Sequence, residues 1–219
     1  MQKNNTLMIG SYYHIYNCGI NGLNIFNDNN DFKKFLSLYD KYIDPIAETF
    51  SWCLMGNHFH LLVRLKEGMV YKYSMDDKSR KDIDFNEIKW ETTSSKSSNT
   101  KLPDPTNHFS HLFTSYSKYF NIKYKRHGAL FERPFKRKLV DNEVYFQRLV
   151  LYIHNNPVHH KFTEHPIEWA WSSYYTILSD KPTKLYRKQV LDWFESKENY
   201  ENTHSNSIDI IEIEKYLEL

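Results

Sequence analysis

The chain has 219 residues, which is enough for one domain with a sizeable core. Aromatic residues make up 16% of it, and the formal net charge of +2 gives no sign of a nucleic-acid partner. Two cysteines do not make a disulfide framework, and no apolar run of about 18 residues predicts a membrane span. The first residues lack the apolar stretch of a signal peptide, so we expect a cytoplasmic protein.

The first third of the chain predicts strands around one helix. Residues 11–19 are aromatic, rich in β-forming residues and followed by a turn cluster, which predicts a strand. Acidic and amide residues followed by apolar residues at helical spacing predict a helix from Asn30 to Tyr42. Residues 47–65 form a second strand region, which we expect to break near Gly56.

The middle of the chain begins with a segment that has no regular pattern. Residues 66–106 are charged and rich in serine, which predicts a flexible insertion or a long loop. Helical spacing resumes over residues 107–128, and Gly128 is the expected end of that helix. Residues 129–140 then predict another strand or a hairpin.

The last third predicts a longer helix and a tail. Residues 141–157 have a polar cap, apolar residues on one side and Pro157 as the expected stop. The tail predicts one short helix at 186–194 and an acidic end. We therefore predict an α+β fold with helices on one face of an antiparallel sheet over residues 1–180, followed by a helical and acidic tail over residues 181–219.

The stretch "MGNHFHLLV" places two histidines, His58 and His60, inside an apolar run. Side chains two residues apart in a strand point to the same side, so His58 and His60 share a face with Leu62 and Arg64. Phe59, Leu61 and Val63 occupy the other face and can pack against helices. Two imidazoles at this spacing can hold one cation. The alternative is a pair of ordinary histidines in a strand.

The helix predicted over residues 141–157 carries a second polar group. Tyr152 and Asn156 are four residues apart and share a helical face, with Arg148 one turn earlier. A tyrosine hydroxyl, with a pKa of about 10, is a poor nucleophile unless a metal or cationic group stabilises the developing charge. Asn156 can supply a neutral oxygen as a third metal ligand. The alternatives are a tyrosine at the core edge and an asparagine at the helix end before Pro157.

These motifs together resemble a known family. "NHFHLLV", followed later by "YIHNNPV", resembles the HUH single-tyrosine transposases of bacterial insertion sequences, and most of all the REP-associated tyrosine transposases. HUH stands for histidine, a hydrophobic residue and histidine. The stretches "YYHIYNCG", "HGALFERPFKRKLV" and "WAWSSY" agree in order, so the resemblance covers roughly Ser11 to Ile177, interrupted by residues 66–106.

The resemblance implies a ferredoxin-like (RRM-like) core with the histidine pair on a central strand. It implies Tyr152 as the nucleophile and His58, His60 and Asn156 as ligands of Mg²⁺ or Mn²⁺. The implied activity is cutting and joining of single-stranded DNA beside a hairpin through a 5′-phosphotyrosine, by a monomer or a homodimer. A usual basic residue after "NPV" is replaced by histidine in this chain.

A basic segment lies between the two motifs. Residues 118–138 carry eight Lys and Arg against one acid, whereas residues 195–219 carry seven acids and two lysines. We expect the basic side chains to grip the DNA backbone and the aromatic residues among them to stack on bases. The alternative is a solvated surface. The expected DNA-binding residues are Arg148, Lys118, Lys123, Lys125, Arg126, Arg133, Lys136, Arg137 and Lys138.

Two other functions fit parts of the pattern. One is a DNA-binding regulator without catalysis, against which the intact set of His58, His60 and Tyr152 argues. The other is a metal phosphodiesterase that uses activated water, which the absence of a covalent protein–DNA adduct would reveal. A zinc site at His154, His159 and His160 is disfavoured, because these residues lie at a helix end without a cysteine or a clear four-ligand pattern.

Overall fold

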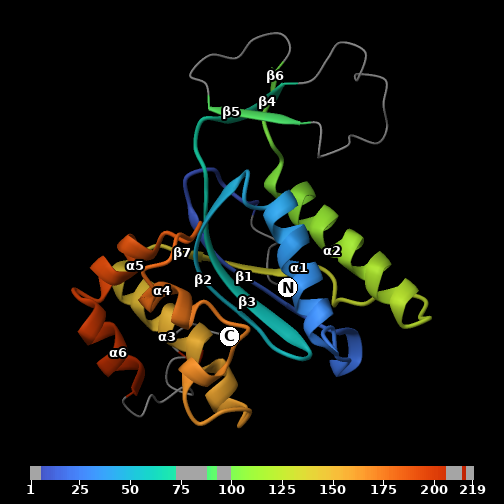
Figure 1. Ribbon diagram of the computed structural model, residues 1–219. Helices are drawn as coiled ribbons and strands as arrows, with labels where there is room; N and C mark the ends of the chain where they lie inside the picture. Colours follow the sequence, from blue (N-terminus) through green and yellow to red (C-terminus); the bar gives the residue numbers. More distant parts are fainter. Residues whose placement is uncertain (1–5, 73–87, 93–99, 206–213, 216–219) are drawn as a thin grey trace.

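The computed structural model describes residues 6–72, 88–92, 100–205 and 214–215. Its main sheet contains β1 (Tyr12–Cys18), β2 (Ala47–Leu54), β3 (His58–Leu65) and β7 (Lys136–Val140), in the order β2-β3-β1-β7. All neighbouring pairs are antiparallel. With α1 (Asn29–Tyr42) after β1 and α2 (Pro105–Lys123) before β7, the order is β-α-β-β-α-β (Figure 1). The predicted α+β fold and its ferredoxin-like topology are confirmed.

Capping residues fix the ends of α1 and α2. The Asp28 side chain accepts hydrogen bonds from the backbone of Asn30 and Asp31 at the start of α1. Gly128 was the expected end of α2, but the helix ends at Lys123. Lys125 has a positive φ of 51°, and the amide of Arg126 donates back into the last turn. This Schellman closure stops the helix at Lys123, five residues before the glycine.

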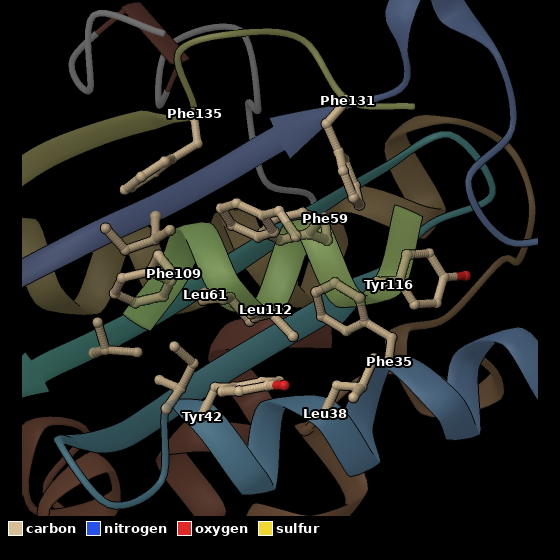
Figure 2. Close-up of a cluster of buried hydrophobic side chains, with 14 of the residues drawn as sticks. Phe35, Leu38, Tyr42, Phe59, Leu61, Phe109, Leu112, Tyr116, Phe131 and Phe135 are labelled. Carbon is tan, nitrogen blue, oxygen red and sulfur yellow. The ribbon is translucent and has the colours of Figure 1, made fainter. Parts of the chain in front are cut away.

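Alternate residues of the central strands build the core under α1 and α2. Phe59, Leu61 and Val63 of β3 are buried against these two helices, as their spacing predicts. Figure 2 shows this cluster, in which Phe59 and Leu61 of the sheet meet Phe35 of α1 and Leu112 of α2. Burial of large side chains on this face supplies the main hydrophobic stabilisation of the sheet.

The other face of the sheet is covered by α3 (Glu143–His159), so the expectation of helices on one face only is corrected (Figure 1). Phe50, Leu62 and Val140 of the sheet pack against Leu149 and Ile153 of α3 in a second core. The sheet carries apolar side chains on both sides, and each side needs a cover.

Helix α3 continues through Pro157, which was the expected stop. Pro157 lies in the last turn, where its missing N–H costs one helical hydrogen bond. The amide of His160 still donates to the carbonyl of Asn156 at 3.0 Å, so the turn closes normally. Asn156 is therefore inside the helix and not at its C-cap, which is His160.

The segment between β3 and α2 contains structure that its composition did not predict. The strands β4 (Met69–Lys72), β5 (Lys89–Thr92) and β6 (Thr100–Lys101) form a second sheet in the order β5-β4-β6. Val70 and Tyr71 are buried, and Trp90 packs on the main core. The expectation of a structureless insertion over residues 66–106 is corrected for these strands; residues 73–87 and 93–99 lie outside the described residues.

The C-terminal part packs on α3. It contains the 3-10 helix η3 (Pro166–Glu168) and the helices α4 (Tyr174–Leu178), α5 (Arg187–Trp193) and α6 (Lys197–Ser205). The predicted helix at 186–194 corresponds to α5, whereas α6 was not predicted. Val190, Phe194 and Tyr200 are buried in the same core as α3. A domain boundary near residue 180 stays a prediction, and most of the acidic end lies outside the described residues.

A short 3-10 helix, η1 (Ile20–Gly22), follows β1.

Among the described residues, no helix has both the length and the apolar character that crossing a bilayer requires.

Candidate active site between helix α3 and the sheet

The two histidines of β3 face α3, as their spacing predicts. His58 is the first residue of β3, and both His58 and His60 lie on the side of the sheet that α3 covers. The His60 ring lies 5.1 Å from the Tyr152 ring, at an interplanar angle of 82°. Asn156 lies one turn further along α3 and contacts His58. Residues from two distant segments thus meet at one end of β3.

Three short contacts orient the imidazoles. The Nε2 of His58 lies 2.7 Å from the Oδ1 of Asn156, and its Nδ1 lies 2.7 Å from the Oδ1 of Asn57. The Nδ1 of His60 lies 2.9 Å from the Nε2 of His14. Each histidine of the pair therefore uses Nδ1 for a protein contact, which is the pattern that holds metal-binding imidazoles in place.

The atoms that surround the His58 ring suit a bound cation. Both contacts of this imidazole end on amide oxygens, which only accept hydrogen bonds. Burial lowers the pKa of His58, so its neutral form, which has one N–H, satisfies one of the two contacts. A cation held jointly by Nε2 of His58 and Oδ1 of Asn156 uses a lone pair of each atom and leaves the N–H for Asn57. His58, His60 and Asn156 thus fit a metal ion.

Burial keeps the other imidazoles neutral as well. Burial, followed by the imidazoles of His14 and His58, lowers the pKa of His60 well below its ordinary value. Burial, together with the nearby charge of Lys138, lowers the pKa of His14 to about 3. Neutral imidazole is the form that binds a metal, so these side chains need no deprotonation step at neutral pH.

The hydroxyl of Tyr152 is protonated at neutral pH. Burial raises the pKa of Tyr152, the carboxylate of Glu214 adds to that rise, and a hydrogen bond with Asn156 opposes it. The side chain is only 5% exposed. A phenol in this state becomes an effective nucleophile when positive charge beside it stabilises the developing anion. Glu214, from the acidic end of the chain, is the group that contributes negative charge beside Tyr152.

Sequence reasoning missed His14, Tyr16 and His160 as neighbours of the site. Tyr16 pairs with His60 across β1 and β3, and its ring lies 5.7 Å from the His60 ring. The exposed His160 ring lies 5.2 Å from the His58 ring. The alternation of His14 and Tyr16 in "YYHIYNCG" shows that they share a face. The register against β3 that brings them to His60 is set by tertiary packing.

The expected DNA-binding residues divide between the two faces of β7. Lys136 pairs with Tyr16 and Lys138 with His14, so both lie on the face of the histidines. Arg137 pairs with Ile15 and lies on the opposite face, near α2. Lys118, Lys125 and Arg133 are exposed, and Arg148 is half-buried on α3.

Lys123 and Arg126 of the basic segment bind other parts of the fold. Lys123 forms ion pairs with Asp28 at 2.8 Å and Asp31 at 2.7 Å, which join α2 to α1. Arg126 donates to the side chain of Asn121 and to the carbonyl of Ala129. A role in binding DNA stays a prediction for all nine basic residues, and Lys123 and Arg126 already use donors within the fold.

No cluster of three or more His, Cys, Asp or Glu suited to a metal occurs in the part of the chain that the structure describes. A site here therefore needs the amide oxygen of Asn156 beside the two imidazoles. His154 does not point to such a site, because it is buried and bound to Ser173, Tyr200 and His204. These contacts give no support to a zinc site at the end of α3.

Comparisons with known proteins give a fold. No family model matches the chain, and no curated protein matches it. A solved structure described as the REP associates tyrosine transposase bound to a REP hairpin has a TM-score of 0.53 to this chain. The match covers 83% of this chain and 88% of that chain, at 13% sequence identity. This chain therefore has a fold similar to that of a tyrosine transposase.

Proposed function

We propose that this protein cuts and rejoins single-stranded DNA beside a hairpin, with Tyr152 as the nucleophile. One observation carries the proposal: Tyr152 and Asn156 of α3 meet His58 and His60 of β3 at one buried edge. A solved structure of similar fold is described as a tyrosine transposase bound to a hairpin, which supports the same reaction class. The resemblance of the two motifs to the HUH family gives these four residues their roles.

The proposed reaction is a transesterification. The oxygen of Tyr152 bonds to the phosphorus, and the bond from phosphorus to the 3′ oxygen breaks. Tyr152 loses its proton and the leaving 3′ oxygen takes one up, which leaves a 5′-phosphotyrosine and a 3′ hydroxyl. Attack by another 3′ hydroxyl reverses these changes and joins the ends. The phosphodiester energy is retained in the intermediate, so no nucleotide cofactor is needed.

The residues around Tyr152 have separate tasks in this reaction. His58, His60 and Asn156 would hold Mg²⁺ or Mn²⁺, which when bound would neutralise the charge that develops on the phosphate. The rings of His60 and His14 meet the Tyr152 ring at 82° and 79°, which fixes its orientation. Lys136 and Lys138 lie on the same face and would hold the flanking phosphates.

The first test is an adduct assay with metal removal. Wild-type protein is incubated with single-stranded oligonucleotides from the DNA that flanks its gene, with and without a hairpin, in Mg²⁺ or Mn²⁺. We expect a denaturant-resistant protein–DNA adduct that EDTA abolishes and added metal restores. His58→Ala and His60→Ala should not form it, whereas His127→Ala, at an exposed histidine outside the site, should.

Other outcomes separate the rival functions. Undiminished cleavage in EDTA contradicts the metal site. Metal-dependent cleavage without any adduct indicates activated water as the nucleophile. Hairpin binding without cleavage in either metal indicates a DNA-binding regulator on the same fold. The expected location, the cytoplasm, and the expected state, a monomer or homodimer, belong to the proposal and need a fractionation and a sedimentation measurement.

A further inference from the structure

A hollow of about 760 Å³ lies on the face of the sheet opposite the histidines. Its walls are α2 and the segment of residues 128–137 that leads into β7. The buried rings of Phe113, Phe131 and Phe135 lie along it, and Figure 2 shows the last two on the α2 side of the sheet. This volume is in the range of pockets that bind small ligands or single building blocks of a polymer.

Arg137 is the main charged group of this hollow. Its Nη1 donates to the hydroxyl of Thr106 at 3.3 Å, and its guanidinium lies 4.7 Å from the centre of the Phe135 ring. Its Nε is buried and has no hydrogen-bond partner among the described residues. Within that same part of the chain, no carboxylate forms an ion pair with it. A half-buried guanidinium with unused donors favours an anionic ligand.

The other charges around the hollow leave it positive. Arg133 is exposed on its wall. Glu132 also lines it, but its carboxylate accepts a hydrogen bond from the amide of Asn21 at 3.3 Å, in the turn after β1. Four hydroxyl side chains of α2 follow one another at helical spacing along the same wall: Thr106, Ser110, Thr114 and Ser117.

These groups together match the parts of one nucleotide. Arginine donors bind phosphate oxygens, and an aromatic floor accepts a base or a sugar face. The hydroxyls of Ser110 and Ser117 donate to the carbonyls of Thr106 and Phe113, so they can accept from a sugar hydroxyl but not donate to a phosphate. The position relative to the active site fits the same ligand. Neighbouring residues of the edge strand β7 point to opposite faces, so Lys136 and Lys138 border the histidines while Arg137 borders the hollow. A DNA strand that crosses this edge contacts both.

We propose that this hollow binds one nucleotide of the DNA strand outside the cleavage site, with its phosphate on Arg137 and Arg133. The inference rests on the proposed function, because the ligand is part of the DNA that Tyr152 cuts. The hollow adds affinity for the flanking strand and takes no part in the chemical step. Binding through it is distinct from the contacts of Lys136 and Lys138 on the catalytic face.

The test compares Arg137→Gln with Lys33→Gln, which removes the same charge from an exposed position on α1 outside the hollow. The probe is a fluorescent hairpin oligonucleotide from the DNA flanking the gene. We expect Arg137→Gln to weaken binding about tenfold or more, as loss of a charged hydrogen bond does. Lys33→Gln should keep both the wild-type affinity for the hairpin and the wild-type rate of adduct formation.

A second measurement does not depend on the folding of Arg137→Gln. A photo-crosslinking amino acid replaces the exposed Thr114 in the hollow, or Lys33 outside it, and only the first should crosslink to the oligonucleotide. Wild-type affinity in Arg137→Gln, or equal crosslinking at both positions, overturns the nucleotide site while leaving the proposed function standing. Failure of the wild-type protein to bind any hairpin oligonucleotide overturns both.

Discussion

At the scale of single residues, His14 links the predicted motif to the rest of the sheet. Its Nε2 lies 2.9 Å from Nδ1 of His60, while its own Nδ1 is buried without a hydrogen-bond partner among the described residues. His14 is fully buried, so it touches neither solvent nor substrate. Its contact fixes which nitrogen of His60 faces the proposed metal.

A matched pair of variants tests this positioning role. His14→Leu removes the contact to His60, whereas His14→Gln keeps an amide that can make it. We expect His14→Leu to bind Mn²⁺ roughly 10- to 100-fold more weakly, because neighbours that hold metal ligands in place contribute about that much. His14→Gln should recover part of the loss. Calorimetric titration with Mn²⁺ measures the affinity of both variants. Equal affinity in wild type and His14→Leu would contradict the positioning role of His14.

At the scale of elements, the two faces of β7 predict separable effects on DNA binding. Lys136 and Lys138 lie on the catalytic face. Replacing both with glutamine should weaken binding to all sequences alike, because phosphate contacts carry no base information. The log–log dependence of affinity on salt should flatten by up to about 1.4, from about 0.7 per lost phosphate contact on a single strand.

The control for this double variant removes two lysines elsewhere. Lys33 on α1 and Lys188 on α5 are exposed, and neither borders the histidines. Their replacement with glutamine should leave the salt dependence unchanged. An unchanged slope in the β7 variant, combined with lost preference for a hairpin, would show that Lys136 and Lys138 read shape or bases.

The contact between α3 and α6 is made by a buried polar network. The Nε2 of His154 lies 2.7 Å from the Ser173 hydroxyl, and its Nδ1 lies 3.2 Å from Nε2 of His204. The Nδ1 of His204 in turn contacts the carbonyl of Tyr200 at 2.7 Å. This network holds α3, which carries Tyr152, against the C-terminal helices. His154, Ser173, Tyr200 and His204 are all buried, so a charge on either imidazole is poorly solvated.

This network predicts a loss of stability in acid. Burial lowers the pKa of His204 to about 4, against about 6.5 in an unfolded chain. The fold therefore favours neutral His204, and its contribution is complete above about pH 6.5 and is lost as the pH falls towards 4. The loss across this window is at most about 3 kcal/mol in the free energy of unfolding.

Urea unfolding at pH 7 and pH 4.5 measures this effect. His204→Gln should lose less stability between the two values than wild type, whereas His127→Gln, at an exposed position, should behave as wild type. Other buried histidines, such as His60, contribute to the acid sensitivity of both proteins, so the comparison isolates His204 alone. An equal loss in His204→Gln and wild type would contradict the assignment.

At the scale of the whole molecule, the local patterns predicted more than the long-range contacts. The alternation of apolar and polar residues correctly predicted that His58 and His60 share one face of β3. The four-residue spacing correctly predicted that Tyr152 and Asn156 share one side of α3. The cover of the histidine face by α3, and the register that brings His14 to His60, depend on packing between distant segments. No local pattern carries that information.

At two further places tertiary packing outweighs the local sequence signal. Proline usually ends a helix, but at Pro157 the packing of α3 against the sheet outweighs one lost hydrogen bond. Residues 66–106 are rich in serine and charge, a composition that predicts a loop. The short strand β4, in which Val70 and Tyr71 are buried, was therefore not predicted. Propensity is a weak guide where tertiary contacts decide.

The central claim, Tyr152 as the covalent nucleophile, is tested most directly by one measurement. Wild type, Tyr152→Phe and Tyr145→Phe are incubated with the same labelled hairpin oligonucleotide and metal, and adducts are resolved under denaturing conditions. Tyr145 lies two turns earlier on α3 and is buried to a similar extent, so it controls for loss of a phenol on this helix. We predict adducts with wild type and Tyr145→Phe and none with Tyr152→Phe, which should still bind the DNA. Cleavage or adduct formation by Tyr152→Phe at the wild-type level would contradict the account.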